Sequence, residues 1–148
     1  MLRRLAAAAV AERPPTGFLR NLVLHSGGER GKVLDIKRRG LMPVETLARW
    51  SGLVAGVSAA TTRARLKASG GAGTLSPDEA ASLREAFELF SSLRMEHQVA
   101  QLRAGEQPDN RIEPSSLTPV TRRSLKEAFR SVARVQRVVE AKANLRSL

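Results

Sequence analysis

The sequence contains no cysteine among its 148 residues, which excludes disulfides, thiolate nucleophiles and Cys-ligated zinc sites. It also has no apolar run approaching the ~20 residues that a membrane span needs. The first ten residues imitate a signal peptide, but their apolar run is short and ends at Glu12 and Arg13, so we expect a helix there. These absences favour a cytoplasmic protein without a membrane partner.

Aromatic residues are also scarce, at 3% of the chain against an apolar share of 42%. The core must therefore consist mainly of Ala, Leu and Val, which favours close-packed helices over a sheet sandwich. A chain of this length fits one domain that buries roughly two thirds of its unfolded surface. We expect a single domain over 1–148, with an N-terminal helix and proline stop at 1–16, a hairpin at 17–40 and a helical bundle at 41–148.

Acidic residues are few relative to basic ones, with 14 Asp and Glu against 25 Lys and Arg and a formal charge of +11. Such an excess indicates an anionic partner, which can be a nucleotide, a nucleic acid, an acidic protein surface or an acidic neighbouring domain. A solvated basic surface without a specific ligand is the alternative. Charge alone does not choose between them.

The turn and breaker residues divide the chain into elements. Pro14 and Pro15 end the first helix, because proline cannot donate to a helical ladder and disfavours the α region in its predecessor. An extended stretch at 18–25, turn residues at 26–31 and alternation at 32–37 predict a hairpin. Arg38-Arg39-Gly40 is expected to be a turn. Two shorter helices are expected at 43–54 and 62–68, followed by a glycine-rich loop at 70–73.

Two long helices follow. Ser76, with Pro77 after it and Glu79 three residues on, forms a capping box, and no helix breaker appears before Gly105. Thr118 and Pro119 open a second long helix that runs to about 145. The polar linker 106–117 joins them, so we predict an antiparallel pair at the centre of a bundle.

The inward stripe of the first long helix changes character along its length. Three- and four-residue spacing gives an apolar half and then a polar half. The polar half is either a solvent-open crevice that faces a ligand or a buried polar network, because dry, unpaired charges cost several kcal/mol. The stripe consists of Ala80, Leu83, Phe87, Phe90, Arg94, His97 and Gln101.

The second long helix carries a basic ridge beside an apolar stripe. The stripe consists of Leu125, Phe129, Val132, Gln136 and Val139; the ridge consists of Arg123, Lys126, Arg130, Arg134 and Arg137. Such a ridge repels itself unless acidic groups lie across it. Glu85, Glu88 and Glu96 are the expected internal partners, and nucleic-acid contact is the alternative.

Two short motifs are weaker signals. The run Lys37-Arg38-Arg39 beside Gly40 suits a phosphate contact. Asp109 and Asn110 follow a proline, where such side chains usually satisfy their own backbone in a turn.

Catalytic constellations are missing from the sequence. His25 and His97 have no carboxylate at metal-ligand spacing, no glycine-rich loop precedes a helix with a Lys-Ser or Lys-Thr pair, and Gly27-Gly28 is not followed by a carboxylate pair that could hold magnesium. Phosphoryl and nucleotidyl transfer need such metal-holding carboxylates, so the chain alone should be inert in both.

Six ordered blocks span nearly the whole chain: GFLRNLVL (17–24), GKVLDIKRRGL (31–41), EAF (85–87), LRMEHQ (93–98), PDNRI (108–112) and LKEAFR (125–130). In this order they resemble the nucleotidyltransferase substrate-binding domain family. That domain normally follows a uridylyltransferase-like catalytic domain, often behind cyclic-nucleotide-binding and CBS modules in bacterial signalling proteins.

The resemblance implies a helical bundle like the C-terminal domains of other nucleotidyltransferases, packed against the catalytic domain in cis or in trans to complete its substrate pocket. It implies that this partner binds magnesium and a nucleoside triphosphate, while this chain binds no cofactor alone, and that the substrate is an anionic nucleotide or a protein. The pocket or interdomain candidates in the matching blocks are Asp35, Lys37, Arg38, Arg94, His97, Gln98, Asp109, Asn110, Lys126 and Arg130.

The leading hypothesis is thus a non-catalytic substrate-binding or regulatory domain of a nucleotidyltransferase, with Arg94, His97, Lys126 and Arg130 grouped around an anion. A basic helical nucleic-acid-binding module is the alternative, disfavoured because acidic residues interleave with the basic ones and no helix-turn-helix signature appears. A purely structural adaptor is a third reading.

Overall fold

The computed structural model describes residues 1–14 and 33–145. In these ranges the chain forms five α-helices, one two-stranded sheet, a π-helical turn and a 3-10 turn. In chain order they are α1 (Leu2–Ala11), β1 (Leu34–Asp35), the π-helix η1 (Lys37–Leu41), α3 (Met42–Val54), α4 (Thr62–Gly71), α5 (Pro77–Arg103), β2 (Arg111–Ile112), the 3-10 helix η2 (Pro114–Ser116) and α6 (Pro119–Leu145).

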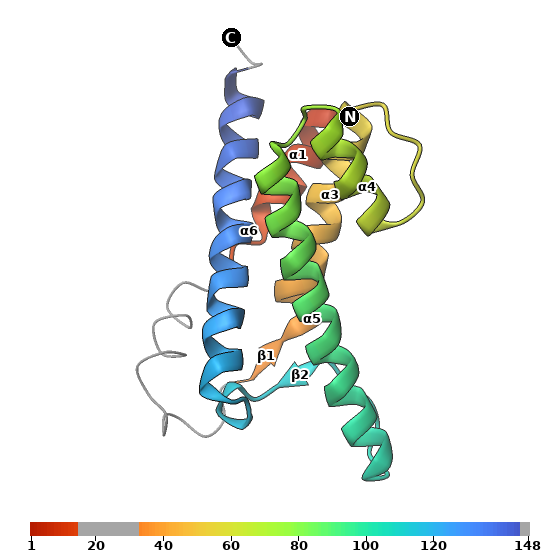
Figure 1. Cartoon of the computed structure of the whole chain (residues 1–148), viewed down its shortest axis with the longest axis vertical. Helices are drawn as coiled ribbons and strands as arrows, with labels where there is room; N and C mark the ends of the chain where they lie inside the picture. Colours follow the sequence, from red (N-terminus) through yellow and green to blue (C-terminus); the bar gives the residue numbers. More distant parts are fainter. Residues whose placement is uncertain (15–32, 146–148) are drawn as a thin grey trace.

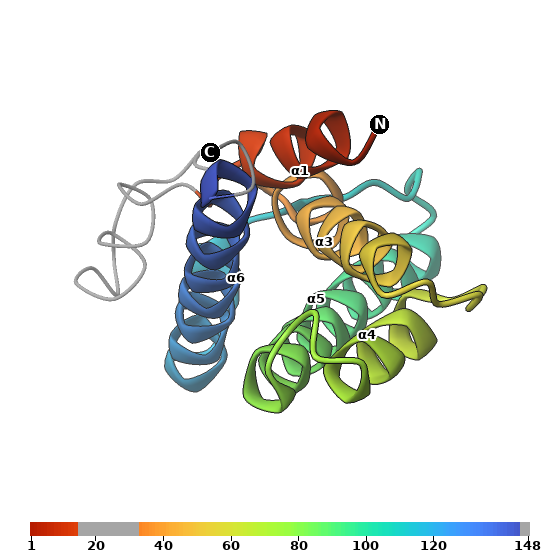
Figure 2. The same cartoon turned by 90° about the horizontal axis from the view of Figure 1, so that it is seen from above.

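The helices pack as a bundle around the two long ones. α5 and α6 run antiparallel, and α5 lies between α6 and α4 (Figures 1 and 2). α3 packs on α4 and on α1, and α1 in turn reaches α6. The predicted mainly helical fold with an antiparallel pair at its centre is confirmed.

The seam between α5 and α6 contains the two largest side chains that are fully buried. Phe90 and Phe129 are both fully buried, and their ring centroids are 5.0 Å apart. α5 begins where its sequence predicts, because the Ser76 side chain accepts from the amide of Glu79 while the Glu79 carboxylate accepts from the amide of Ser76. The capping box therefore fixes where α5 begins, and the contact between the two rings fixes the centre of the seam.

The small sheet joins distant parts of the chain. Leu34 pairs with Ile112 and Asp35 with Arg111, in antiparallel register. The predicted hairpin placed the partner strand and the turn at 18–31, which lie outside the described residues. The second predicted strand is observed only at Leu34–Asp35, because helical backbone already begins after it.

The predicted turn at Arg38-Arg39-Gly40 is wrong, since these residues form the π-helix η1, which continues directly into α3. The reason lies in packing against α5. A Cβ at Gly40 would stand 2.9 Å from Cγ of the Phe90 ring, closer than side chains normally approach. The glycine is therefore needed for the close approach of η1 to α5 rather than for a turn.

The predicted glycine loop is also shorter than expected. Gly70 and Gly71 are the last residues of α4, which was predicted to end near Ala68. Gly70 lies against α5, where an added Cβ would be 3.0 Å from the Cβ of Ala80. Gly70 is therefore needed for the close contact between α4 and α5.

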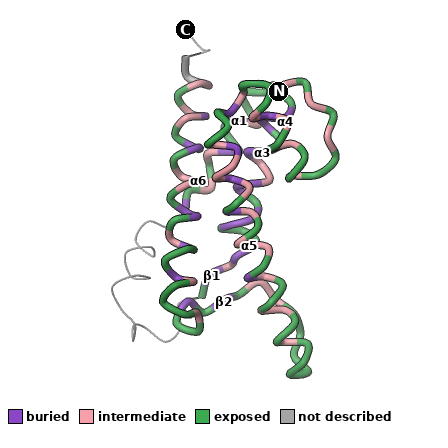
Figure 3. The backbone as a smooth tube through the Cα atoms, in the orientation of Figure 1, coloured by how far each residue is buried: buried purple, intermediate pink, exposed green. Residues whose placement is uncertain are grey.

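Burial is uneven along α5. Its first two thirds contribute buried residues to the core, whereas none of its residues after Leu93 is fully buried, and this end projects beyond the body of the bundle (Figure 3). In the described ranges, no helix has the length and apolarity that crossing a membrane requires. The projecting end of α5 carries the polar half of the predicted stripe.

Candidate functional site

A polar network joins the end of α5 to the linker before β2. Arg94 Nε donates to Asn110 Oδ1 at 2.7 Å, and His97 Nε2 lies 2.8 Å from Asp109 Oδ1. The Gln98 side-chain amide donates to the carbonyl of Asp109 at 3.1 Å and to Asn110 Oδ1 at 3.3 Å. The structure thus brings together five of the predicted site residues.

Backbone bonds extend this network into the sheet. The amide of Asp109 donates to Gln101 Oε1 at 2.8 Å, and the carbonyl of Asn110 accepts from the amide of Ile36 at 2.9 Å. Asp109 Oδ1 also accepts from the amide of Arg111 at 2.9 Å, as an Asx turn does. The network therefore fixes the linker against both α5 and β1.

The electrostatics of the network centre on Asp109. The hydrogen bond from His97 lowers the pKa of Asp109 below its usual value, and the bond from the amide of Arg111 lowers it further. The carboxylate thus remains ionised and accepts from the imidazole, whose exposed fraction is only 24%. This arrangement orients His97 toward the linker.

The predicted site residues near β1 make local contacts. Asp35 Oδ1 accepts from the amide of Arg38 at 2.9 Å and so satisfies the start of η1. The guanidinium groups of Arg38 and Arg39 lie 3.4 and 3.8 Å from the carboxylate of Glu12, just past α1. Lys37 is exposed. The basic run predicted as a phosphate contact therefore binds the N-terminal segment through two of its members.

The basic residues of α6 form one outward face, which we call the α6 ridge: Arg123, Lys126, Arg130, Arg134 and Arg137. Lys126 is half-buried and the others are exposed. Arg130 pairs with Glu127 on the same helix, at 2.9 Å. Within the described ranges, the other four members of the ridge have no acidic partner.

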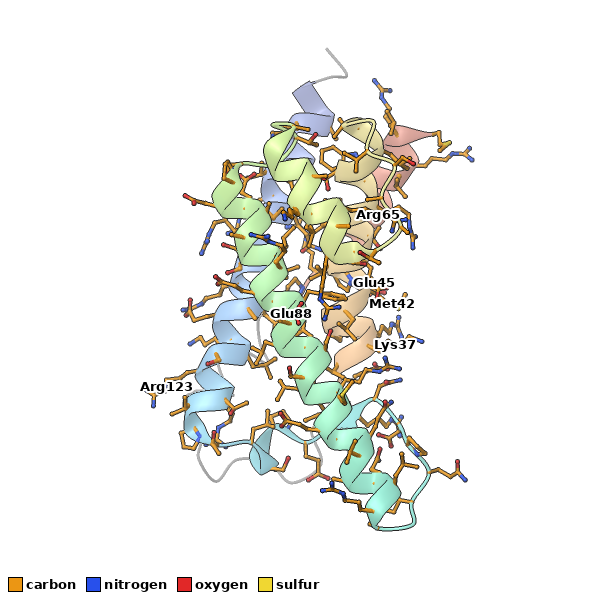
Figure 4. The ribbon with its side chains drawn as sticks, turned by 45° about the vertical axis from the view of Figure 1, so that its right-hand side comes forward. Lys37, Met42, Glu45, Arg65, Glu88 and Arg123 are labelled. Atoms are coloured by element: carbon orange, nitrogen blue, oxygen red, sulfur yellow. The ribbon has the colours of Figure 1, made fainter. Side chains whose placement is uncertain are left out.

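The predicted internal pairing of the ridge with Glu85, Glu88 and Glu96 is wrong for Glu88, which forms a bidentate pair with Arg63 of α4. This pair lowers the pKa of Glu88 and raises that of Arg63. In Figure 4, Arg123 projects outward from α6, whereas Glu88 lies on α5 toward α4. Glu88 cannot reach the ridge because it points from the opposite side of α5.

The pocket predicted from four residues divides into two groups. Arg94 and His97 bond to the linker, while Lys126 and Arg130 belong to the α6 ridge. No hydrogen bond or ion pair connects the two groups in the part of the chain that the structure describes. Their joint contact with one anion stays a prediction.

Gln136 has a structural role that the sequence pattern did not predict. Spacing places it on the apolar stripe of α6, and it is indeed 1% exposed. Its side-chain amide donates to the carbonyls of Ala9 at 3.0 Å and Glu12 at 2.9 Å, at the end of α1. No local signal could have revealed this contact, because the two segments are more than 120 residues apart.

A hollow of about 720 Å³ between α4 and α5 was also missed. Its lining includes the cations Arg63, Lys67 and Arg84, which the sequence did not connect because they come from two helices. Where the structure describes the chain, no three His, Asp or Glu side chains gather into a group that could hold a metal ion.

Comparison with protein families gives one result. The family described as "Putative nucleotidyltransferase substrate binding domain" matches residues 1–143. The match covers all of α1 to α5 and nearly all of α6. Comparison with curated proteins and with solved structures gives no match.

Proposed function

Because this chain belongs to the nucleotidyltransferase substrate-binding domain family, we propose that it is a non-catalytic substrate-binding or regulatory domain that works beside a nucleotidyltransferase catalytic domain. The catalytic domain, in the same polypeptide or a separate one, supplies the magnesium and the nucleoside triphosphate. This chain supplies a cationic face for an anionic surface or substrate.

The observation that carries the proposal is the α6 ridge. Its five cations recur every three or four residues, so they line one face over roughly 20 Å at 1.5 Å per residue. Four of them lack an acidic partner among the described residues, and like charges at this spacing repel one another. An anionic partner relieves that repulsion, and arginine offers it planar, bidentate donors.

The other candidates have a positioning role in this proposal. Arg94, His97 and Gln98 hold Asp109 and Asn110, and that linker leads through β2 and η2 into the first turn of α6. The network therefore sets where the ridge begins relative to α5. Lys126 and Arg130 lie on the α6 ridge itself, where Lys126 has no acidic partner among the described residues and Arg130 pairs with Glu127 of the same helix.

We expect neutralisation of the ridge to weaken association with the catalytic domain encoded with this chain. The Arg130→Gln/Arg134→Gln/Arg137→Gln variant should raise the dissociation constant roughly 10- to 100-fold, since three interfacial charges together contribute about 1.4–2.8 kcal/mol. Calorimetric titration measures the affinity, and transfer from a labelled nucleoside triphosphate measures the effect on activity.

The matched control removes the same charge from scattered exposed positions. The Arg3→Gln/Arg49→Gln/Arg103→Gln variant changes α1, α3 and the end of α5 and leaves the ridge intact. It should bind the catalytic domain within about twofold of the wild type. Equal losses in the two triple variants, or no loss in the ridge variant, would contradict the proposal.

Nucleic-acid binding is the second candidate, and the same unpaired ridge favours it. It requires an affinity for DNA or RNA whose logarithm falls with that of salt concentration by roughly 0.7–0.9 per neutralised phosphate. Titration of the chain alone with labelled duplex and single strands at several salt concentrations separates the candidates. Tight, salt-dependent binding together with no affinity for the catalytic domain would select nucleic acid.

A further inference from the structure

We propose that the hollow between α4 and α5 is a binding site for a small phosphate-bearing molecule. Helix α4 lies on the side of α5 away from α6 (Figure 2), and the hollow is lined by residues of α4, its N-cap and α5, so it is separate from the α6 ridge. Its volume, about 720 Å³, is within the range of small-ligand pockets. The lining consists of Thr61, Arg63, Ala64, Lys67, Ala81, Arg84, Glu85 and Glu88.

Arg84 lines the hollow and has an unpaired guanidinium nitrogen. Its Nε atom is buried and has no hydrogen-bond partner, and its guanidinium group makes no ion pair among the described residues. Buried donors are almost always paired in folded proteins, because an unpaired donor retains its desolvation cost. An anion in the hollow offers the guanidinium group acceptors in the bidentate geometry that phosphate matches.

The first turn of α4 contributes free backbone amides. Thr61 caps this helix by accepting from the amide of Ala64 at 3.1 Å, which leaves the amides of Thr62 and Arg63 without an acceptor in the described residues. The start of a helix has a positive potential and free donors, both of which favour phosphate. Lys67, one turn further along α4, is exposed and adds a mobile ammonium group.

The acidic residues that line the hollow limit the charge of the anion that it can bind. Arg63 is occupied by Glu88, and its guanidinium carbon lies 5.4 Å from the centre of the Phe87 ring. Glu85 also lines the hollow and makes no ion pair among the described residues. The free cations therefore exceed the free carboxylates by one, which suits a single phosphate group and disfavours a polyanion such as a nucleic-acid backbone.

The test titrates the isolated full chain with ribose 5-phosphate and, separately, with ribose. We expect the phosphate ester to bind with a dissociation constant of about 1 mM or below, and we expect no binding of ribose. Arg84→Met should weaken binding about tenfold or more, because it removes a charge-assisted donor pair but keeps the aliphatic stem. Lys67→Met, at an exposed position that folding does not depend on, should weaken it about threefold or more.

Arg103→Met is the matched control, since it removes the same group from an exposed position at the far end of α5 and should leave the affinity unchanged within about twofold. No binding of ribose 5-phosphate up to about 10 mM would overturn the inference. So would equal affinity for ribose, or equal losses in the Arg84 and Arg103 variants. The experiment contains no catalytic domain, so its failure is distinguishable from failure of the proposed function.

Discussion

The Phe90→Ala variant is expected to lose about 3–5 kcal/mol of the free energy of unfolding, the cost of removing a fully buried phenyl ring from a packed core. Phe90 contacts three elements at once: its own helix, Phe129 of α6 with ring centroids 5.0 Å apart, and η1 at Gly40. Its neighbours α6 and η1 are helical, so they can move only partly into the vacated space. Urea denaturation followed by circular dichroism measures the loss.

Phe87→Ala is the matched control, because it removes the same ring three residues earlier in the same helix. Phe87 is only partly buried, and Arg63 lies over its ring at 5.4 Å. Its removal should cost about 1–2 kcal/mol, from a smaller apolar burial and one cation–π contact. Equal losses in the two variants would show that the α5 seam is not packed as described.

The Gln136→Glu variant is expected to be similarly destabilising at neutral pH, by about 3–5 kcal/mol. It keeps the size of the side chain but replaces the buried donor with a carboxylate that faces the carbonyls of Ala9 and Glu12. Burial and the two carbonyl oxygens raise the folded-state pKa of that carboxyl group. Relative to the wild type, the stability of the variant should therefore be highest below about pH 4, where both states are protonated, and fall as the pH rises toward the raised folded-state value.

Gln136→Met separates charge from lost hydrogen bonding. It leaves both carbonyls unpaired but introduces no charge and removes Oε1, which is buried without a partner in the glutamine. The cost should be about 1–3 kcal/mol and should not depend on pH between 4 and 8. A carboxylate variant whose stability does not change over this pH range would contradict the placement of Gln136 against α1.

Local sequence signals predicted the helices well because their causes are local. The capping box at Ser76, the proline stop after α1 and the three-residue spacing of the α5 and α6 stripes each act within one or two turns. The spacing also placed Arg94, His97 and Gln101 on the inward stripe of α5, and the structure shows all three bonded to the linker. The sequence therefore located the polar network, although not its partners.

The missed features depend on contacts between distant residues. Asp35 pairs with Arg111 across the small sheet, and Gln136 caps the end of α1, which no local pattern encodes. Glu88 was assigned to the α6 ridge because its charge is complementary, but its direction on α5 places it against α4. Helical periodicity gives the direction of a side chain and not the identity of the neighbouring helix.

The central claim is that the α6 ridge meets an anionic partner, and a footprint of arginine reactivity tests it most directly. The chain is treated with phenylglyoxal alone and with the nucleotidyltransferase catalytic domain encoded with it, and mass spectrometry measures modification of each arginine. We predict that Arg123, Arg130, Arg134 and Arg137 lose reactivity in the complex, while Arg3 and Arg49 do not. Unchanged reactivity along the ridge in a complex that has formed would contradict the account.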